Sequence, residues 1–303
     1  MNEPIASARL LLEGLVDYAG LFPPAGLDMA PAVRQYAEHL VSDAAWMLGR
    51  FIVPAARLQE FEDAAAALLP RDTDAAPWAI SVLGGTDPAD DAERVWAFNE
   101  RHAHRAIGRA VIDTMELRAA DASSAERVAR SVPASVTPYV EIPIGDDPSD
   151  LIGVLRGVGA RAKVRTGGVT ADAFPAPSVV ARFIRGCADA GVPFKATAGL
   201  HHPLRGDYRL TYDAGSPSGT MYGFLNIFLA AALAPQGLDL AELERILTEA
   251  DPAALQFDAQ GISWRGRRLD LDDLRHVRAR AAVAFGSCSF TEPVADLRAL
   301  HII

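Results

Sequence analysis

The sequence contains few cysteines, few lysines and no long apolar run, and each scarcity excludes a class of protein. Its 303 residues include only two cysteines, Cys187 and Cys288, which cannot form a disulfide framework. The longest strongly apolar stretch, 224–234 (FLNIFLAAALA), is much shorter than the roughly 20 residues that cross a bilayer. The net charge of −10 argues against a general binder of nucleic-acid phosphates. We therefore expect neither a membrane nor a nucleic acid as a partner.

The amino-terminal segment also lacks the features of a secretory signal. Residues 1–15 (MNEPIASARLLLEGL) have no basic flank followed by an apolar run, and no small-residue cleavage site. Half of all residues are apolar and 22% are charged, a composition typical of folded globular proteins. These observations predict a cytoplasmic protein that buries a large core.

Lysine is rare among the cationic residues. Of the 29 lysines and arginines, 27 are arginine, and the two lysines are Lys163 and Lys195. An arginine guanidinium does not lose its proton or form an imine at ordinary pH, whereas a lysine amine in a suitable environment does both. The two lysines are therefore the first candidates for covalent chemistry.

Short apolar runs recur about every 30 residues with helical patterns between them, which is the cadence of β/α units. We predict strands within eight ranges: 14–22, 45–54, 78–85, 106–118, 137–145, 161–168, 193–200 and 282–290. Asp87-Pro88 and Asp147-Pro148 predict helix starts, with Asp as the cap and Pro as the first helical residue. No glycine-rich nucleotide-binding motif is present. Eight strands favour a (β/α)8 TIM-type barrel of the α/β class over an open sheet.

The segment between the seventh and eighth predicted strands, about 201–281, is too long for one β/α unit. It contains helical patterns at 223–234 and 240–250, and a hairpin at 255–266 that turns at Gln260-Gly261. We predict an insertion on a single barrel domain (1–303), because the last apolar run is needed to close the barrel. The first of these helices is apolar nearly all round, so we expect it to be buried in the fold or in a subunit interface, which is compatible with a homodimer.

Polar residues and glycines cluster at the carboxyl ends of the predicted strands, where barrels of this kind carry out chemistry. Because side chains alternate along a strand, Lys163 and Arg165 face the same way, as do Lys195 and Thr197. If that face is the barrel interior, these cations share one crevice with Asp113, Glu116 and Glu141. A lysine near another cation or an apolar wall becomes a neutral nucleophile.

Three segments resemble the deoxyribose-phosphate aldolase family of class I aldolases: KVRTGG at 163–168, KATAGL at 195–200 and FGSCSFTEPVADL at 285–297. In that family a barrel strand ends in a Lys-x-x-Thr-Gly run, the next strand carries a lysine before small residues, and the eighth strand turns into a helix. The resemblance covers residues 107–200 and 283–298.

The resemblance implies roles for particular residues. Lys163 would form the Schiff base, and Lys195 would be the cation that favours its neutral amine. Asp113 would assist proton transfer. Phosphate-binding turns would contain three further residues: Gly199, Gly286 and Ser287.

We therefore predict a lyase, aldolase-like, that acts on a small carbonyl or anionic metabolite, phosphorylated or not, without a cofactor. Acid–base catalysis is assigned to Asp113, Glu116 or Glu141. The predicted substrate-binding residues are Arg165, Thr166, Gly167, Thr197, Gly199, His201, His202, Gly286, Ser287 and Ser289.

Two other functions are open at this stage. Glu116, Glu141 and a histidine of the His201-His202 pair could bind a divalent metal, with a lysine as the base for enolate chemistry. Adjacent histidines point in opposite directions on an extended chain, and no spacing typical of metal sites is present. The third function is a non-catalytic binder of small anionic metabolites, which does not require lysine rather than arginine.

Purely structural roles are also open for several residues. Glu116 could pair with Arg118, and Glu141 with Arg165, as structural ion pairs. Cys288 precedes a predicted helix and could be a nucleophile, although a small residue that fills a tight turn is the simpler explanation.

Overall fold

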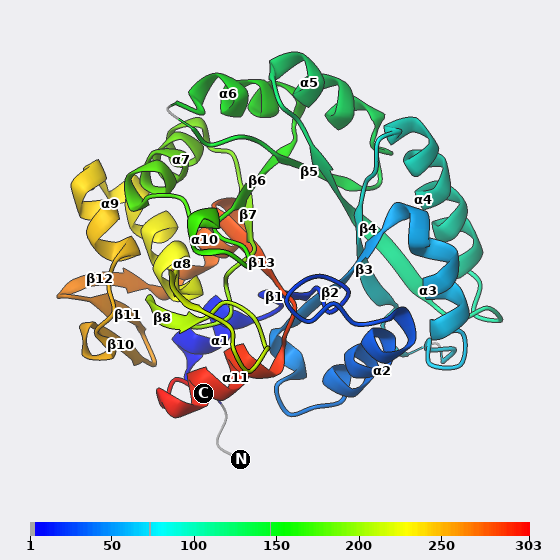
Figure 1. The fold of residues 1–303 in the computed structure, drawn as a ribbon, viewed down its shortest axis with the longest axis horizontal. Helices are drawn as coiled ribbons and strands as arrows, with labels where there is room; N and C mark the ends of the chain where they lie inside the picture. The colour runs from blue at the N-terminus through cyan, green and yellow to red at the C-terminus, as the bar shows by residue number, and fades with distance from the viewer. Residues whose placement is uncertain (1–3, 73, 146) are drawn as a thin grey trace.

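The computed structural model describes residues 4–72, 74–145 and 147–303, and eight of its strands close into a parallel barrel (Figure 1). The order around the barrel is β1-β13-β7-β6-β5-β4-β3-β2, so the last strand pairs with the first. The barrel strands are β1 (Val16–Tyr18), β2 (Leu48–Pro54), β3 (Trp78–Leu83), β4 (Ala110–Arg118), β5 (Thr137–Glu141), β6 (Arg161–Arg165), β7 (Phe194–Thr197) and β13 (Ala282–Ser287). One strand lies in each predicted range, and the predicted (β/α)8 fold is confirmed.

Helices surround the barrel, and their starts follow local capping chemistry. They are α1 (Ala6–Leu12), α2 (Met29–Leu40), α3 (Leu58–Ala65), α4 (Pro88–His102), α5 (Ala122–Ser131), α6 (Ser149–Val158), α7 (Pro177–Ala190) and α11 (Thr291–Ala299). Asp87 caps α4 as predicted, because its carboxylate accepts the N–H groups of Ala89 and Asp90. The predicted start of α6 is wrong by one residue. Asp147 accepts the N–H of Ser149, so Pro148 precedes the helix instead of beginning it.

An insertion separates β7 from β13, as predicted. Its elements are the hairpin β8 (Gly206–Arg209) and β9 (Ser218–Met221), then α8 (Phe224–Leu233), α9 (Leu240–Leu247), the sheet of β10 (Leu255–Asp258), β11 (Gly261–Trp264) and β12 (Arg267–Asp270), and α10 (Leu271–Arg280). Both predicted helices and the predicted hairpin are confirmed, but the hairpin turns at Ala259-Gln260, one residue before the predicted Gln260-Gly261. The sequence patterns did not indicate β8, β9, β12 or α10.

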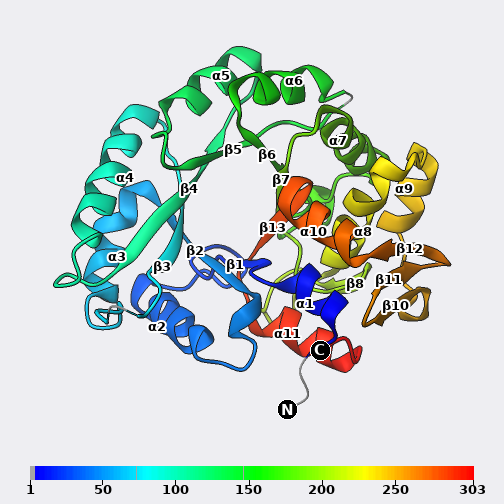
Figure 2. The ribbon, with the colours of Figure 1, turned by 180° about the vertical axis from the view of Figure 1, so that it is seen from behind.

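The insertion completes the outer layer beside α7. Figure 2 shows its yellow and orange elements outside the part of the barrel formed by β7 and β13. Helices α8 and α10 both contact β13, and the ring of Phe224 stacks on that of Phe285 with centroids 4.8 Å apart. Helix α8 is therefore buried within this chain. No helix in the described part of the chain is both long and apolar enough to cross a membrane.

One buried amide ties the insertion together. The side chain of Asn226 in α8 donates to the carbonyls of Ile246 (2.7 Å) and Glu249 (2.9 Å), and it accepts the N–H of Arg205 (2.9 Å). Helix α8 is thereby joined both to the end of α9 and to the segment that follows β7.

Strand register brings charged residues together inside the barrel. Glu141 pairs with Lys163, and Lys163 pairs with Lys195, across β5, β6 and β7. Paired residues of a parallel sheet point to the same face, so all three enter the interior, where most barrels of this type place branched apolar residues.

Candidate active site

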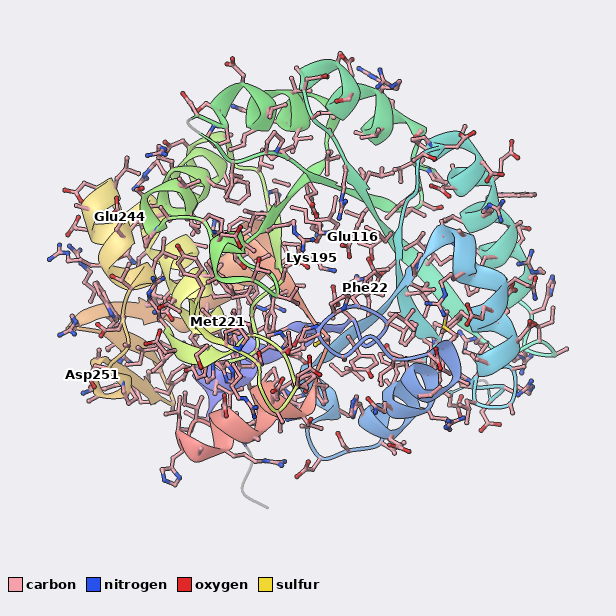
Figure 3. The ribbon with its side chains drawn as sticks, in the orientation of Figure 1. Phe22, Glu116, Lys195, Met221, Glu244 and Asp251 are labelled. Carbon is pink, nitrogen blue, oxygen red and sulfur yellow. The ribbon has the colours of Figure 1, made fainter. Side chains whose placement is uncertain are left out.

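A chain of ion pairs runs across the barrel interior, and Glu116 lies at its centre. Glu116 Oε2 is 2.9 Å from Lys163 Nζ, and Glu116 Oε1 is 2.5 Å from Lys195 Nζ. Ser81 also donates its hydroxyl to Oε1 at 2.7 Å. Figure 3 shows Glu116 and Lys195 close together inside the barrel. The two lysines therefore share one carboxylate.

Each lysine has a second carboxylate on its other side. Lys195 Nζ lies 2.6 Å from Asp17 Oδ2, and Lys163 Nζ lies 2.9 Å from Glu141 Oε2. Glu141 Oε1 is in turn 3.3 Å from Arg118 Nε. We call these six residues the lysine network; its three carboxylates and three cations alternate. The side chains of Asp17, Glu116 and both lysines are almost fully buried. Their pairing offsets the hydration free energy that these charges lose on burial.

The network fixes the charge states of its central members. Burial would raise the pKa of Glu116, but the ammonium groups of Lys163 and Lys195 outweigh it and hold that pKa well below its usual range. Burial would likewise lower the pKa of Lys195, but Asp17 and Glu116 outweigh it and raise that pKa. Glu116 is therefore a carboxylate and Lys195 an ammonium at neutral pH.

A glycine makes room for Asp17 inside the barrel. An alanine Cβ at Gly49 of β2 would overlap the Asp17 carboxylate. Asp17 Oδ1 accepts the N–H of Arg50 at 2.6 Å, so the carboxylate is fixed against β2. The signal in the sequence is a single Asp within the apolar strand at 16–18, but that signal does not reveal its lysine partner.

A cavity of about 340 Å³ opens at the carboxyl ends of the strands, and Lys163 lies in its wall. The loop after β1 covers part of it with Ala19, Phe22 and the Pro23-Pro24 pair. Lys195 is outside the lining, behind Glu116. Lys163 is therefore the lysine that a bound molecule meets first.

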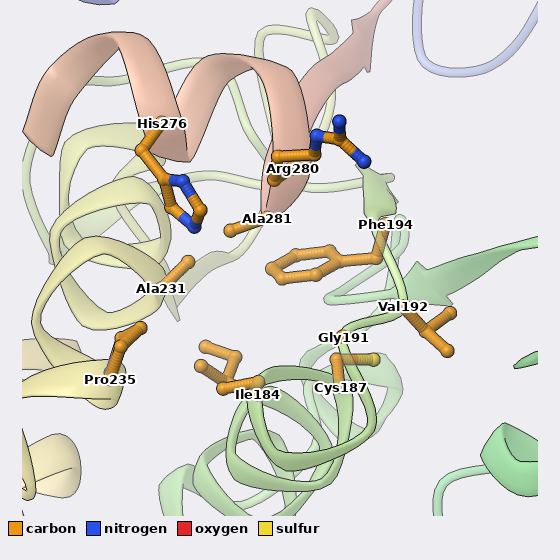
Figure 4. A pocket seen from close by; sticks show the side chains of 11 residues that line it. Ile184, Cys187, Gly191, Val192, Phe194, Ala231, Pro235, His276, Arg280 and Ala281 are labelled. Atoms are coloured by element: carbon orange, nitrogen blue, oxygen red, sulfur yellow. The ribbon is translucent and has the colours of Figure 1, made fainter. Parts of the chain in front are cut away.

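A second cavity lies at the opposite end of the strands and is slightly larger, about 430 Å³ (Figure 4). It lies between α7, α8 and α10, next to Phe194 and Ala281 at the amino ends of β7 and β13. Its lining is mostly apolar, and burial raises the pKa of Cys187 there. Barrel enzymes place their chemistry at the carboxyl ends, so the smaller cavity is the candidate active site.

The structure brings seven predicted site residues to this cavity: Glu116, Lys163, Arg165, Thr197, Gly199, His201 and Gly286. Glu141 contacts Lys163 and also lines an adjoining open groove. Arg118 and Arg165 line both the cavity and the groove, and both are exposed. Within the described part of the chain, Arg165 makes no ion pair and no side-chain hydrogen bond. The cavity mouth is therefore cationic.

Asp113 is outside the cavity lining. It is the extra residue of a β-bulge, since β3 pairs Ile80 with Ile112 and then Ser81 with Thr114. The Asp113 carboxylate binds the Arg50 guanidinium through two hydrogen bonds of 2.5 and 2.7 Å. The role that the resemblance implies for Asp113 therefore has no support in this geometry.

Thr166 and Gly167 shape the turn after β7 and do not line the cavity. Thr166 is fully buried and donates to the carbonyl of Ala198 at 2.9 Å. Ala198 and Gly199 both adopt positive φ, 65° and 70°, a conformation that is unfavourable for alanine. The hydrogen bond from Thr166 therefore helps to hold the turn in this conformation. Gly167 packs so closely on Phe174 that a Cβ would overlap the ring.

His202, Ser287 and Ser289 are also outside the cavity lining. His202 pairs with Asp296 at 2.6 Å and stacks on the ring of Tyr208. Ser287 Oγ accepts the N–H of Ser289, and Ser289 Oγ accepts the N–H of Glu292 in the first turn of α11. These hydroxyls are already used by the backbone, and the residues of this turn that line the cavity are Gly286 and Cys288.

The simple ion pairs considered from the sequence are arranged differently. Arg118 pairs with Glu141, not with Glu116, and Glu141 does not pair with Arg165. Ser81, which no sequence pattern indicated, holds Glu116. Burial raises the pKa of the Cys288 thiol, which disfavours the thiolate that a cysteine nucleophile requires.

No group of three or more His, Cys, Asp or Glu side chains among the described residues is arranged to hold a metal ion. Glu116 and Glu141 face lysines, and the two histidines pair with different carboxylates, Glu292 and Asp296. No protein-family model matches the chain, and no curated protein matches it.

Proposed function

We propose that this protein is an aldolase-type carbon–carbon lyase in which Lys163 forms an imine with the carbonyl of a small metabolite. The observation that carries the proposal is the position of Lys163. It lies in the wall of the carboxyl-end cavity and is joined through Glu116 to a second buried lysine. A non-catalytic barrel that only bound anions would not need lysine at both positions, because every other cationic side chain of this sequence is arginine.

The proposed reaction begins with loss of a proton from Lys163. Glu141 Oε2 lies 2.9 Å from Nζ and has no hydrogen bond among the residues that the structure describes, so it is positioned to accept the proton. The neutral amine adds to the carbonyl carbon. The resulting carbinolamine then takes up the proton held by Glu141 as its hydroxyl leaves as water, which gives an iminium ion. Glu116 stays ionised between the two lysine positions and stabilises the positive iminium nitrogen.

Cleavage of the carbon–carbon bond follows from the iminium. A substrate hydroxyl on the β-carbon gives its proton to Glu141, which is again a carboxylate, and becomes a carbonyl. The bond between the α- and β-carbons breaks, and its electron pair enters the iminium as an enamine. Protonation of the enamine carbon and hydrolysis of the imine then release the second product. Arg118 and Arg165 at the mouth favour a substrate with a phosphate or carboxylate group.

Borohydride trapping tests this proposal. The protein is incubated with pyruvate, acetaldehyde, glyceraldehyde 3-phosphate or dihydroxyacetone phosphate, reduced, and analysed by intact mass and peptide mapping. A parallel sample receives 2,4-pentanedione, a 1,3-diketone that forms a stable conjugate with a reactive lysine whatever the natural substrate is. We expect a single adduct on Lys163, absent from Lys163→Arg, which keeps the positive charge.

The other outcomes each count against part of the proposal. An adduct on Lys195 would keep the chemistry and reverse the two lysine roles. Lack of any adduct, the diketone conjugate included, would overturn the imine mechanism. Activity that then depends on an added divalent metal would favour enolate chemistry, and ligand binding without turnover would favour the anion binder.

A further inference from the structure

His201 is a histidine whose ring is held at one nitrogen and free at the other. It follows β7, lines the cavity and is 8% exposed. Its Nδ1 lies 3.2 Å from Glu292 Oε2. An ionised carboxylate only accepts hydrogen bonds, so the neutral ring carries its proton on Nδ1 and its lone pair on Nε2. Nε2 has no hydrogen-bond partner among the residues that the structure describes.

Glu292 is itself fixed from two directions. Tyr212, in the loop between β8 and β9 of the insertion, donates its hydroxyl to Glu292 Oε2 at 2.7 Å. Burial would raise the pKa of Glu292, but the hydrogen bonds from His201 and Tyr212 outweigh it and lower that pKa. The carboxylate therefore stays ionised and keeps His201 in the tautomer that presents a basic Nε2.

We propose that His201 is the catalytic base that exchanges the proton on the carbon next to the imine carbon, with Glu292 and Tyr212 as its positioning residues. This inference rests on the imine mechanism proposed above. In the step, Nε2 takes a proton from the α-carbon of the iminium. The C–H electron pair becomes the enamine double bond, and the C=N π pair moves to nitrogen, which becomes neutral. His201 becomes an imidazolium whose charge Glu292 balances, and the reverse step protonates the enamine.

The other titratable groups of the cavity are less suited to this step. Glu116 is held as a carboxylate between two lysines, and its low pKa makes it a weak base. Glu141 contacts Lys163 and Arg118. The Cys288 thiol has a raised pKa. His201 alone among the described residues of the lining is an imidazole with one nitrogen that makes no hydrogen bond.

His202 provides a matched control in the next position. It has the same side chain and a similar pairing, since its Nδ1 lies 2.6 Å from Asp296 Oδ2. However, its ring stacks on Tyr208 and is outside the cavity lining. A general effect of losing a histidine–carboxylate pair next to α11 would appear in both variants, whereas a catalytic effect would appear only at His201.

The experiment compares His201→Gln with His202→Gln in two assays. The first measures reductive trapping of pyruvate or dihydroxyacetone phosphate on Lys163, which reports imine formation. The second measures deuterium uptake from D2O at the α-carbon of the same ketone by NMR, which reports proton transfer. Thermal unfolding of each variant confirms that it is folded.

We expect His201→Gln to trap the ketone as wild type does, while deuterium uptake per trapped lysine falls by about 100-fold or more, the usual contribution of a general base. His202→Gln should stay within about twofold of wild type in both assays. Glu292→Gln should lower uptake by about 10-fold without loss of trapping. The neutral amide no longer balances the imidazolium charge, and its NH2 group can donate to Nδ1, so the tautomer is no longer fixed.

Two results would overturn the inference in different ways. Equal deuterium uptake by His201→Gln and His202→Gln, with trapping intact, would mean that another group moves the proton, and the imine mechanism would stand. Failure of the wild-type protein to trap any ketone or the diketone on Lys163 would remove the imine itself, and with it both proposals.

Discussion

Glu116 is the residue on which both lysines depend. It is almost fully buried, and each of its oxygens faces one lysine. A buried charge is tolerated only when its partners offset the loss of hydration. Removal of this one carboxylate therefore leaves two ammonium groups with one carboxylate each, in a site that water barely enters.

We predict that Glu116→Gln is destabilised by about 3–5 kcal/mol at neutral pH, the usual cost of breaking a buried ion pair from one side. Urea unfolding at pH 7 measures this difference. Glu60→Gln is the control, because Glu60 pairs with Arg57 at the surface, where such pairs contribute little. A Glu116→Gln variant as stable as the control would show that the lysine network does not depend on its central charge.

The same charges predict how stability varies with pH. The pKa of Glu116 in the folded state lies below its usual 4.5, so its contribution is complete above about pH 4.5 and is lost as pH falls towards the folded value. The pKa of Lys195 lies above its usual 10.5, so its contribution is complete below about pH 10.5 and is lost as pH rises. Urea unfolding across this range should show a decline on both sides. Glu116→Gln should lose less stability than wild type on the acid side, and equal slopes would contradict this assignment.

At the scale of elements, local patterns predicted the strands and failed for parts of the insertion. The eight barrel strands are apolar runs that enter a core on both faces, so their composition reveals them. In helix α10 only Leu274 and Val277 are buried, and most of its other residues are charged. The hairpin strands β8 and β9 have four residues each. Such elements are stabilised by what they pack against and leave little periodic signal.

Asn226 shows how much one polar side chain can contribute to an element. It is buried in the apolar helix α8 and satisfies three backbone groups, those of Arg205, Ile246 and Glu249. Asn226→Ala would leave the Arg205 N–H and the Glu249 carbonyl unpaired, and each costs about 1–3 kcal/mol. The Ile246 carbonyl would keep the N–H of Glu249 as its partner. We expect a loss of about 2–5 kcal/mol in urea unfolding.

Gln236→Ala is the control for that measurement, because Gln236 is exposed just beyond α8 and should change stability by less than about 0.5 kcal/mol. If Asn226→Ala were equally mild, α8 and α9 would be held by apolar contacts alone, and the amide would be incidental.

For the whole molecule, the predicted single domain implies that barrel and insertion unfold together. The closed barrel needs β13, and α8 and α10 of the insertion pack on that strand. Ile262 of β11 and Phe285 of β13 belong to one continuous apolar core. A break in the insertion should therefore expose the barrel as well.

Native-state hydrogen exchange tests this cooperativity. We expect the amides of Ile262 and Phe285 to exchange with the same opening free energy, and with the same dependence on denaturant. A clearly lower value for Ile262 would show that the sheet β10-β11-β12 opens by itself, and the chain would then be better described as a barrel with a separable unit.

The sequence by itself determined the β/α cadence, the eight strands and the position of both lysines on neighbouring strands, because these depend on local periodicity and on the order of strands along the chain. It also placed Glu116, Glu141 and His201 at strand ends facing the same crevice as Lys163. The tertiary structure decided which carboxylate meets which lysine.

Tertiary structure also decided that Lys163, not Lys195, faces the cavity, that Asp113 is engaged by Arg50, and that Glu292 and Tyr212 hold His201. These contacts join residues far apart in the chain, and a shift of one residue in register would exchange one partner for another. Strand pairing and barrel closure set that register, and these arise only when all eight strands meet.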